Sequence, residues 1–126
     1  MKQWLILIVS LIVLILSGIW EINYLKNSSI YALSDLEYSR NLVENGNFTL
    51  ANEQINSIDD SWKNIKTVWS IFIDHEEIGN IDERILDYKT CIELKDKDEA
   101  IKAAKELERI FKHVVEKQEI RVGNII

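Results

Sequence analysis

Apolar residues follow two different patterns along this chain. From Trp4 to Trp20 they form a continuous run without a charged residue, and beyond it they recur every three or four positions. The seventeen residues of the run would extend about 25 Å as a helix, close to the thickness of a bilayer's hydrocarbon core. A tryptophan stands at each end, where aromatic rings favour the membrane interface. The run therefore predicts a membrane anchor over residues 1–22.

A cleaved signal peptide is the alternative interpretation of this run. Lys2 would supply its positive end, but cleavage after Gly18 would place Leu16 at the −3 position, where a small residue is needed. An uncleaved anchor therefore fits better. Lys2 and the short segment before the run favour a cytoplasmic N-terminus. We expect a single-pass protein of the cell membrane with residues 23–126 outside the cytoplasm.

The three-four spacing beyond the anchor predicts helices. The first segment continues from the anchor to Asn45-Gly46-Asn47, and Asn47 or Thr49 can cap the second. The second pattern breaks near Asp74, and one continuous helix through Gly79 remains the alternative to two helices. A capping box of Asp96 and Glu99 starts the last segment, which we expect to end near Val115, before a short tail.

Narrow apolar stripes of this kind are covered only by other helices. We therefore predict an all-α protein in which the membrane helix continues into an antiparallel up-down bundle of three to four helices over residues 23–126. The expected core residues are Ile55, Ile58, Trp62, Ile65, Trp69, Phe72, Ile81, Ile85, Leu107 and Phe111. The absence of proline suits long helices.

A shift of 49 residues superimposes two of the stripes. Ala51, Ile55, Ile58, Trp62 and Ile65 then fall on Ala100, Ala104, Leu107, Phe111 and Val114. One explanation is duplication of a helical hairpin. The other is that 49 residues are seven heptads, so that any two stripes in phase would match.

Charge and cysteine content exclude several functions. Residues 21–126 contain all 21 acidic residues and 14 of the 15 basic residues, a net charge of −7. This balance argues against nucleic-acid binding and against electrostatic docking on anionic lipid. The single cysteine, Cys91, cannot form an internal disulfide or a cysteine-based zinc site. Its position beside an apolar stripe indicates a small residue at the edge of the core.

Two histidines are the residues most able to carry chemistry. His75 and Glu76 precede the third segment, and His113 and Glu116 lie late in the fourth. In an up-down bundle both histidines fall at the membrane-facing end, so this set could bind a divalent metal. The spacing matches no established ligand motif, and solvated helix ends are the alternative. We expect no catalytic residue and no cofactor.

Three tyrosines recur every seven residues beside the first apolar stripe. Core-edge packing and a contact surface for a partner both explain such a row. If the row is a contact surface, the membrane-facing end with its terminal isoleucines extends it. The residues predicted for interaction are Tyr24, Tyr31, Tyr38, His75, His113, Ile125 and Ile126.

The chain resembles a family of small bacterial membrane proteins known only as domain of unknown function 4363. The segments that carry the resemblance are Asn23-Tyr24-Leu25, Trp69–Ile81, Cys91–Ala100, Phe111–Lys117 and Asn124-Ile125-Ile126. The resemblance implies a membrane-anchored helical protein of endospore-forming Gram-positive bacteria. It implies no activity, no catalytic residue and no cofactor.

We therefore expect a non-enzymatic protein that contacts membrane lipid through its anchor and binds another membrane or envelope protein through its bundle. A homo-oligomer is a further option for the partner. The alternative function is a membrane-anchored sensor or divalent-metal-binding module that uses the His75/His113 end.

Overall fold

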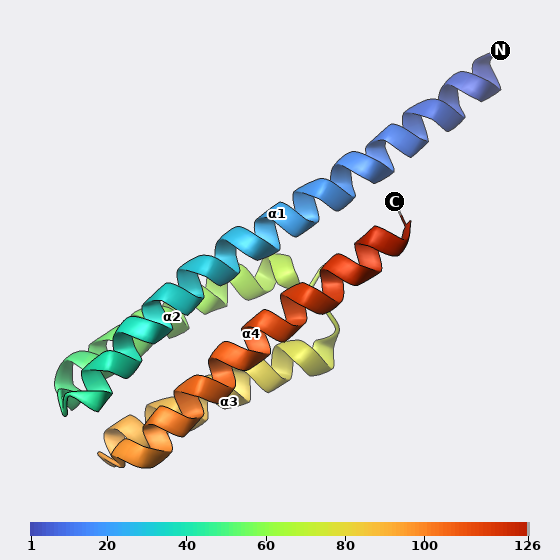
Figure 1. The fold of residues 1–126 in the computed structure, drawn as a ribbon. Helices are drawn as coiled ribbons and strands as arrows, with labels where there is room; N and C mark the ends of the chain where they lie inside the picture. The colour runs from blue at the N-terminus through green and yellow to red at the C-terminus, as the bar shows by residue number, and fades with distance from the viewer. Residues whose placement is uncertain (126) are drawn as a thin grey trace.

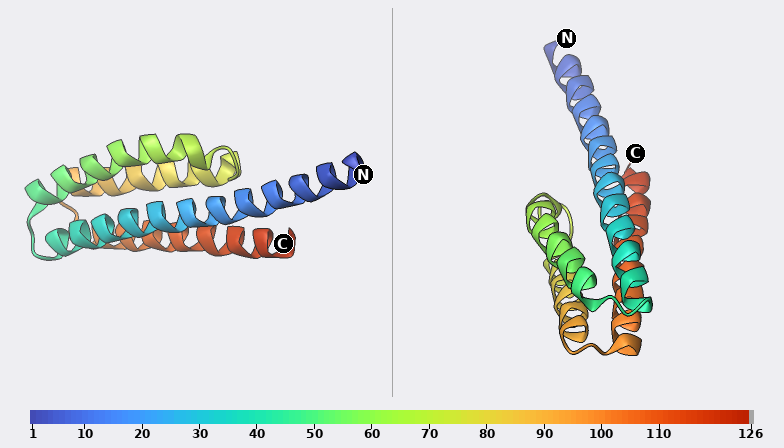
Figure 2. Two further views of the ribbon diagram at one scale, coloured as in Figure 1. Left: turned by 90° about the horizontal axis from the view of Figure 1, so that it is seen from above. Right: turned by 90° about the vertical axis from the view of Figure 1, so that its left-hand side faces the viewer.

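The computed structural model describes residues 1–125 and confirms the all-α class. Four helices follow one another in an up-down arrangement (Figure 1): α1 (Lys2–Glu44), α2 (Phe48–Trp69), α3 (His75–Glu93) and α4 (Lys97–Ile125). Figure 2 shows α1 beside α4 in one layer and α2 beside α3 in the other. The N-terminal part of α1 projects beyond the bundle, which places the predicted anchor at one end.

The second and third segments are two separate helices. α2 ends at Trp69, where the amides of Phe72 and Ile73 both donate to the Trp69 carbonyl, at 3.1 and 2.8 Å. Asp74 has an extended ψ of 141° and precedes the first residue of α3. Gly79 therefore lies inside α3 and does not interrupt a single long helix.

The prediction that the fourth helix ends near Val115, before a short tail, is wrong. α4 continues to Ile125. The buried positions after Val115 are Gln118 and Val122, which keep the helical spacing. The side-chain amide of Gln118 donates to the carboxylate of Glu21 on α1, and Lys26 Nζ lies 3.1 Å from Glu119 Oε1. Because a polar side chain, Gln118, occupies a packed position, the apolar spacing did not predict the last turns of α4.

The turn after α1 and the turn after α3 lie at the end of the bundle away from the anchor, and we call them the distal turns. They share one geometry. After α1, the amides of Gly46 and Asn47 donate to carbonyls of the last turn, at 2.9 and 2.8 Å, and Gly46 has a φ of +77°. After α3, Lys95 and Asp96 repeat both bonds at 3.0 Å, and Lys95 has a φ of 55°. Both are Schellman motifs. A lysine in this left-handed conformation costs about 1 kcal/mol more than glycine.

The predicted helix caps are present after both turns. The amide of Leu50 donates to Asn47 Oδ1, and the amide of Glu99 donates to Asp96 Oδ1, each at 3.3 Å. Each side chain thereby satisfies one of the unpaired amides of a helix start. Asn47, and not Thr49, is therefore the cap of α2.

The core is a cluster of aliphatic side chains around three aromatic rings. Trp62, Trp69 and Phe111 contact one another edge to face, with ring centroids 5.3 to 5.8 Å apart. Both indole nitrogens have partners, since Trp62 Nε1 donates to Asp82 at 2.7 Å and Trp69 Nε1 to Ser28 at 2.9 Å. Eight of the ten predicted core residues are buried, and Ile65 and Phe72 pack half-buried at its edge.

The 49-residue relation extends from the sequence into space. Ser39 and Tyr88, separated by 49 residues, share a hydrogen bond of 2.7 Å. Trp62 and Phe111 have the same separation and stand in contact, with ring centroids 5.7 Å apart. Residues that correspond under the shift therefore meet each other. These two contacts are those expected if an approximate two-fold axis relates the hairpin α1–α2 to the hairpin α3–α4.

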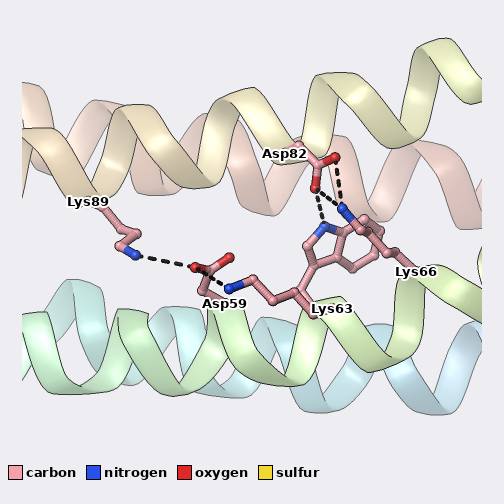
Figure 3. Close-up of polar contacts among 6 residues, drawn as sticks. Asp59, Lys63, Lys66, Asp82 and Lys89 are labelled. Atoms are coloured by element: carbon pink, nitrogen blue, oxygen red, sulfur yellow. Dashed lines mark hydrogen bonds and ion pairs between the residues drawn. The ribbon is translucent and has the colours of Figure 1, made fainter.

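One ion pair between helices has a counterpart under the same shift. Arg40 Nε lies 3.1 Å from Glu108 Oε1, and the corresponding pair joins Lys89 Nζ to Asp59 Oδ2 at 3.2 Å. Figure 3 shows Asp59 between Lys89 and Lys63. Heptad phase explains matching apolar stripes but not matching charges and turns. The structure therefore favours an internal duplication.

Candidate functional site

The three predicted contact tyrosines are not equivalent in the structure. Tyr31 is 73% exposed and Tyr38 is 51% exposed. Tyr24 is half-buried and stacks on Trp20, with centroids 5.5 Å apart and planes at 24°. Core-edge packing therefore accounts for Tyr24 but not for Tyr31 and Tyr38. These two leave large amphipathic rings in solvent on the outer face of α1.

A small apolar hollow of about 50 Å³ lies beside Tyr31, between α1 and α2. Ala32, Ile58, Trp62 and Phe111 form its walls. Ala32 corresponds to Ile81 under the 49-residue shift, so the hairpin α1–α2 has a methyl group where the other hairpin has a larger side chain. The difference in size leaves the space open. It can accept one small apolar group from outside, and Tyr31 stands at its edge.

We call Tyr31, Tyr38 and this hollow the α1 face. Asp35 and Ser61 add polar groups to the rim of the hollow. An exposed ring beside an apolar hollow with a polar rim matches the arrangement of a protein-contact surface. The hollow is too small for a cofactor or a metabolite, which need several hundred Å³.

The histidine end contains a larger and more polar hollow of about 650 Å³. Its walls include His113, Glu76, Glu77 and Lys117, and Lys117 Nζ lies 3.0 Å from Glu77 Oε1. The pairing with Glu77 raises the pKa of the exposed Lys117 ammonium group. His75 is the first residue of α3, so both histidines lie toward the α2–α3 turn, away from Gly46.

The four residues predicted as metal ligands do not converge. His113 and Glu76 share the large hollow, whereas Glu116 lines a different one on the α1 side of α4, and His75 lines neither. Within residues 1–125, no three His, Cys, Asp or Glu side chains are arranged to hold a metal ion. Of the remaining predicted contact residues, Ile126 lies outside the described residues, and Ile125 is described only as the backbone end of α4.

Burial shifts the ionisation of several side chains outside the α1 face. It raises the pKa of Tyr88 to about 12, although the hydrogen bond from Ser39 opposes the shift. It also raises the pKa of the Cys91 thiol, and the acidic groups Asp96 and Glu99 reinforce this effect. A thiol with a raised pKa is a weak nucleophile at neutral pH. Both groups therefore serve packing.

The periodicity of the apolar residues does not predict the polar contacts between helices. The Arg40–Glu108 contact raises the pKa of the guanidinium group despite its burial, and Lys66 joins Trp62 on the carboxylate of Asp82. A sequence signal did exist for the first of these. Arg40 and Glu108 each have a residue of the same charge 49 positions away, as the ion pair of Lys89 and Asp59 shows.

This architecture defines a class: an antiparallel four-helix bundle whose first helix is long and apolar enough to span a membrane. The family model described as domain of unknown function DUF4363 matches residues 19–125, and the chain belongs to that family. The resemblance seen in the sequence is thereby confirmed. No curated protein and no solved structure matches the chain.

Proposed function

We propose that this protein is a single-pass membrane protein whose bundle stands outside the cytoplasm and binds another envelope protein through the α1 face. The observation that carries the proposal is the exposure of Tyr31 and Tyr38, of which Tyr31 stands at the edge of an apolar hollow. Neither ring is needed to cover the core, because both lie in solvent.

The anchor is supported by the exposure of its apolar side chains over most of the run. The window that qualifies α1 as a candidate span has a mean hydropathy of 2.7 and is not buried by the bundle. The exposed large side chains of this part include Trp4, Leu5, Leu7, Ile8, Leu11, Ile12, Leu16 and Trp20. Water is a poor solvent for such a surface, whereas a bilayer covers it without any further protein.

We also propose that the protein is not an enzyme. The side chains with raised pKa values in the core, Tyr88 and Cys91, do not line the α1 face or the histidine hollow. The alternative, a metal-binding sensor at the His75/His113 end, has less support because only His113 and Glu76 of its four candidate ligands share a hollow. Partner binding therefore remains the better proposal.

Topology provides the first test. With a cytoplasmic N-terminus and one span, a phosphatase that folds only outside the cytoplasm should be active when fused after Ile126, and a cytoplasmic reporter should be inactive at the same position. The membrane fraction should contain the full-length chain. Activity of the cytoplasmic reporter would reverse the orientation, and release of a chain that lacks residues 1–18 would remove the anchor.

Photocrosslinking tests the α1 face itself. With benzoylphenylalanine in place of Tyr31 or Tyr38, illuminated cells should give one discrete adduct of the full-length membrane protein. The same label in place of Leu86, which is exposed on α3, is the matched control and should give none. Aromatic side chains at the centre of an interface carry much of its binding energy, so Tyr38→Ala should weaken the adduct formed at position 31.

Three outcomes of this experiment would contradict the proposal. Equal adducts at Tyr31 and Leu86 would show that the partner does not bind the α1 face in particular. An adduct of twice the chain mass would identify a second copy in place of another protein. The absence of an adduct at both tyrosines, in cells where the topology is as proposed, would leave the α1 face without a partner.

A further inference from the structure

The end of α4 lies alongside the apolar part of α1. Gln118 is hydrogen bonded to Glu21, the first charged residue after the apolar run. Helix α4 continues for seven more residues to Ile125, which corresponds to about 10 Å along its axis. Since the two helices are antiparallel, those residues lie beside the outer third of the predicted membrane span (Figure 2).

Burial of side chains at this level agrees with that placement. Val122 is only 8% exposed, and the end of α4 extends past the α2–α3 turn in the left view of Figure 2. On α1, Ile15 and Gly18 are half-covered, whereas the other residues from Trp4 to Trp20 are exposed. These two lie three residues apart, on one side of the helix. The last turns of α4 therefore pack on that side of the apolar run.

The remaining uncovered length of the anchor is short. Residues 4–14 are exposed all round, and eleven helical residues extend about 16 Å, roughly half the hydrocarbon thickness of a bilayer. If the end of α4 stayed in water, the exposed sides of Ile19 and Trp20 would stay in water with it. If lipid surrounds both helices at this level, the apolar sides of Ile19 and Trp20 are not exposed to water.

The composition of this segment fits the same location. Residues 120–126 contain no acidic residue and one charged residue, Arg121. Ile120 and Arg121 are exposed. An arginine can extend its guanidinium group to the headgroups while its stem stays among acyl chains. The terminal carbonyls of α4 also need water or headgroups, which favours the headgroup–acyl boundary over the bilayer centre.

We infer that the last two turns of α4 form a second membrane contact, at the headgroup–acyl boundary of the leaflet on the bundle side. The inference rests on the proposed membrane anchoring of α1. The occupant of this surface is phospholipid, because the surface is continuous with the apolar side of the anchor. A bilayer that meets two helices here thins locally around the short uncovered span.

Site-directed spin labelling of the full chain in vesicles of phosphatidylcholine and phosphatidylglycerol tests this depth. Each variant has Cys91→Ala and one new cysteine. Gly123→Cys and Asn124→Cys are the test positions, both exposed, and a Cβ at Gly123 meets nothing within 4 Å. Leu14→Cys reports the anchor, and Leu94→Cys reports the exposed distal turn. The measurement compares the collision rate of each label with lipid-soluble oxygen and with a water-soluble nickel complex.

At positions 123 and 124, the oxygen-to-nickel ratio should lie between the values at Leu14 and Leu94 and exceed that at Leu94 several-fold. Ratios at 123 and 124 that equal the Leu94 value, with Leu14 still in lipid, would place the end of α4 in water and overturn the inference while leaving the anchor intact. A Leu14 value equal to that of Leu94 would instead overturn the anchor itself, and the second contact with it. Cysteine at two neighbouring positions guards against a local effect of one substitution.

Discussion

Trp62→Ala should lower the free energy of unfolding by about 3–5 kcal/mol, the cost of removing a large aromatic side chain from a packed core. Trp62 is 2% exposed and contacts both Trp69 and Phe111. The lost indole would leave a cavity at the contact between the two hairpins. Urea unfolding of the full-length protein in detergent, followed by far-UV circular dichroism, measures the change.

Two matched variants separate the cavity from the lost hydrogen bond. Trp62→Phe keeps a ring but removes the donor to Asp82, which retains Lys66 at 3.3 Å, so its effect should be less than half as large. Tyr31→Ala removes an exposed ring and should change stability by at most about 0.5 kcal/mol. A loss below about 1 kcal/mol for Trp62→Ala would show that the indole is not part of a packed core.

Raising the pH should destabilise the protein through Tyr88. Burial raises the pKa of this phenol from 10.0 to about 12. Below pH 10 the phenol is neutral in both the folded and the unfolded chain. Above it, the unfolded chain releases the proton while the folded chain keeps it, so folding stability falls. Two pKa units correspond to about 3 kcal/mol, lost progressively up to about pH 12.

Tyr88→Phe isolates this contribution from the other groups that titrate at high pH. The variant lacks the hydrogen bond to Ser39 and should be less stable than the wild type at pH 8 by about 1 kcal/mol. It has no phenol to ionise at this position, so the order should reverse near pH 12. Ser39→Ala keeps the phenol and should keep the alkaline loss. A constant difference between wild type and Tyr88→Phe across this range would show that Tyr88 gains its charge as easily in the folded chain.

Much of the fold follows from spacing alone. A continuous apolar run and four stripes of period three to four have one simple arrangement, in which helices cover each other's stripes. Turn chemistry at Gly46 and the caps Asn47 and Asp96 then set where the distal turns lie. These local signals agree with the packing, and a bundle of three to four helices could therefore be predicted, with the break between α2 and α3 left open.

The rest depends on partners that are distant in the sequence. In the sequence, Gln118 interrupts the apolar stripe of the last helix. Its burial is explained only by its acceptor, Glu21, which lies 97 residues earlier. The hollow on the α1 face arises because Ala32 is small relative to its counterpart Ile81, a comparison that requires the two-fold arrangement. The row of tyrosines was visible, but its division into a half-buried Tyr24 and two exposed rings depends on where Trp20 lies.

The two-fold relation also bears on the order of events during synthesis. The hairpin α1–α2 leaves the ribosome first, and its contact residues Ser39 and Trp62 meet their counterparts only after Tyr88 and Phe111 have been made. At 5–20 residues per second, a delay of 49 residues is about 2–10 s. In that interval a nascent hairpin on a neighbouring ribosome presents a surface of the same design. Slow translation or crowding of new chains thus favours pairing between molecules, whereas prompt completion of each chain favours pairing within one.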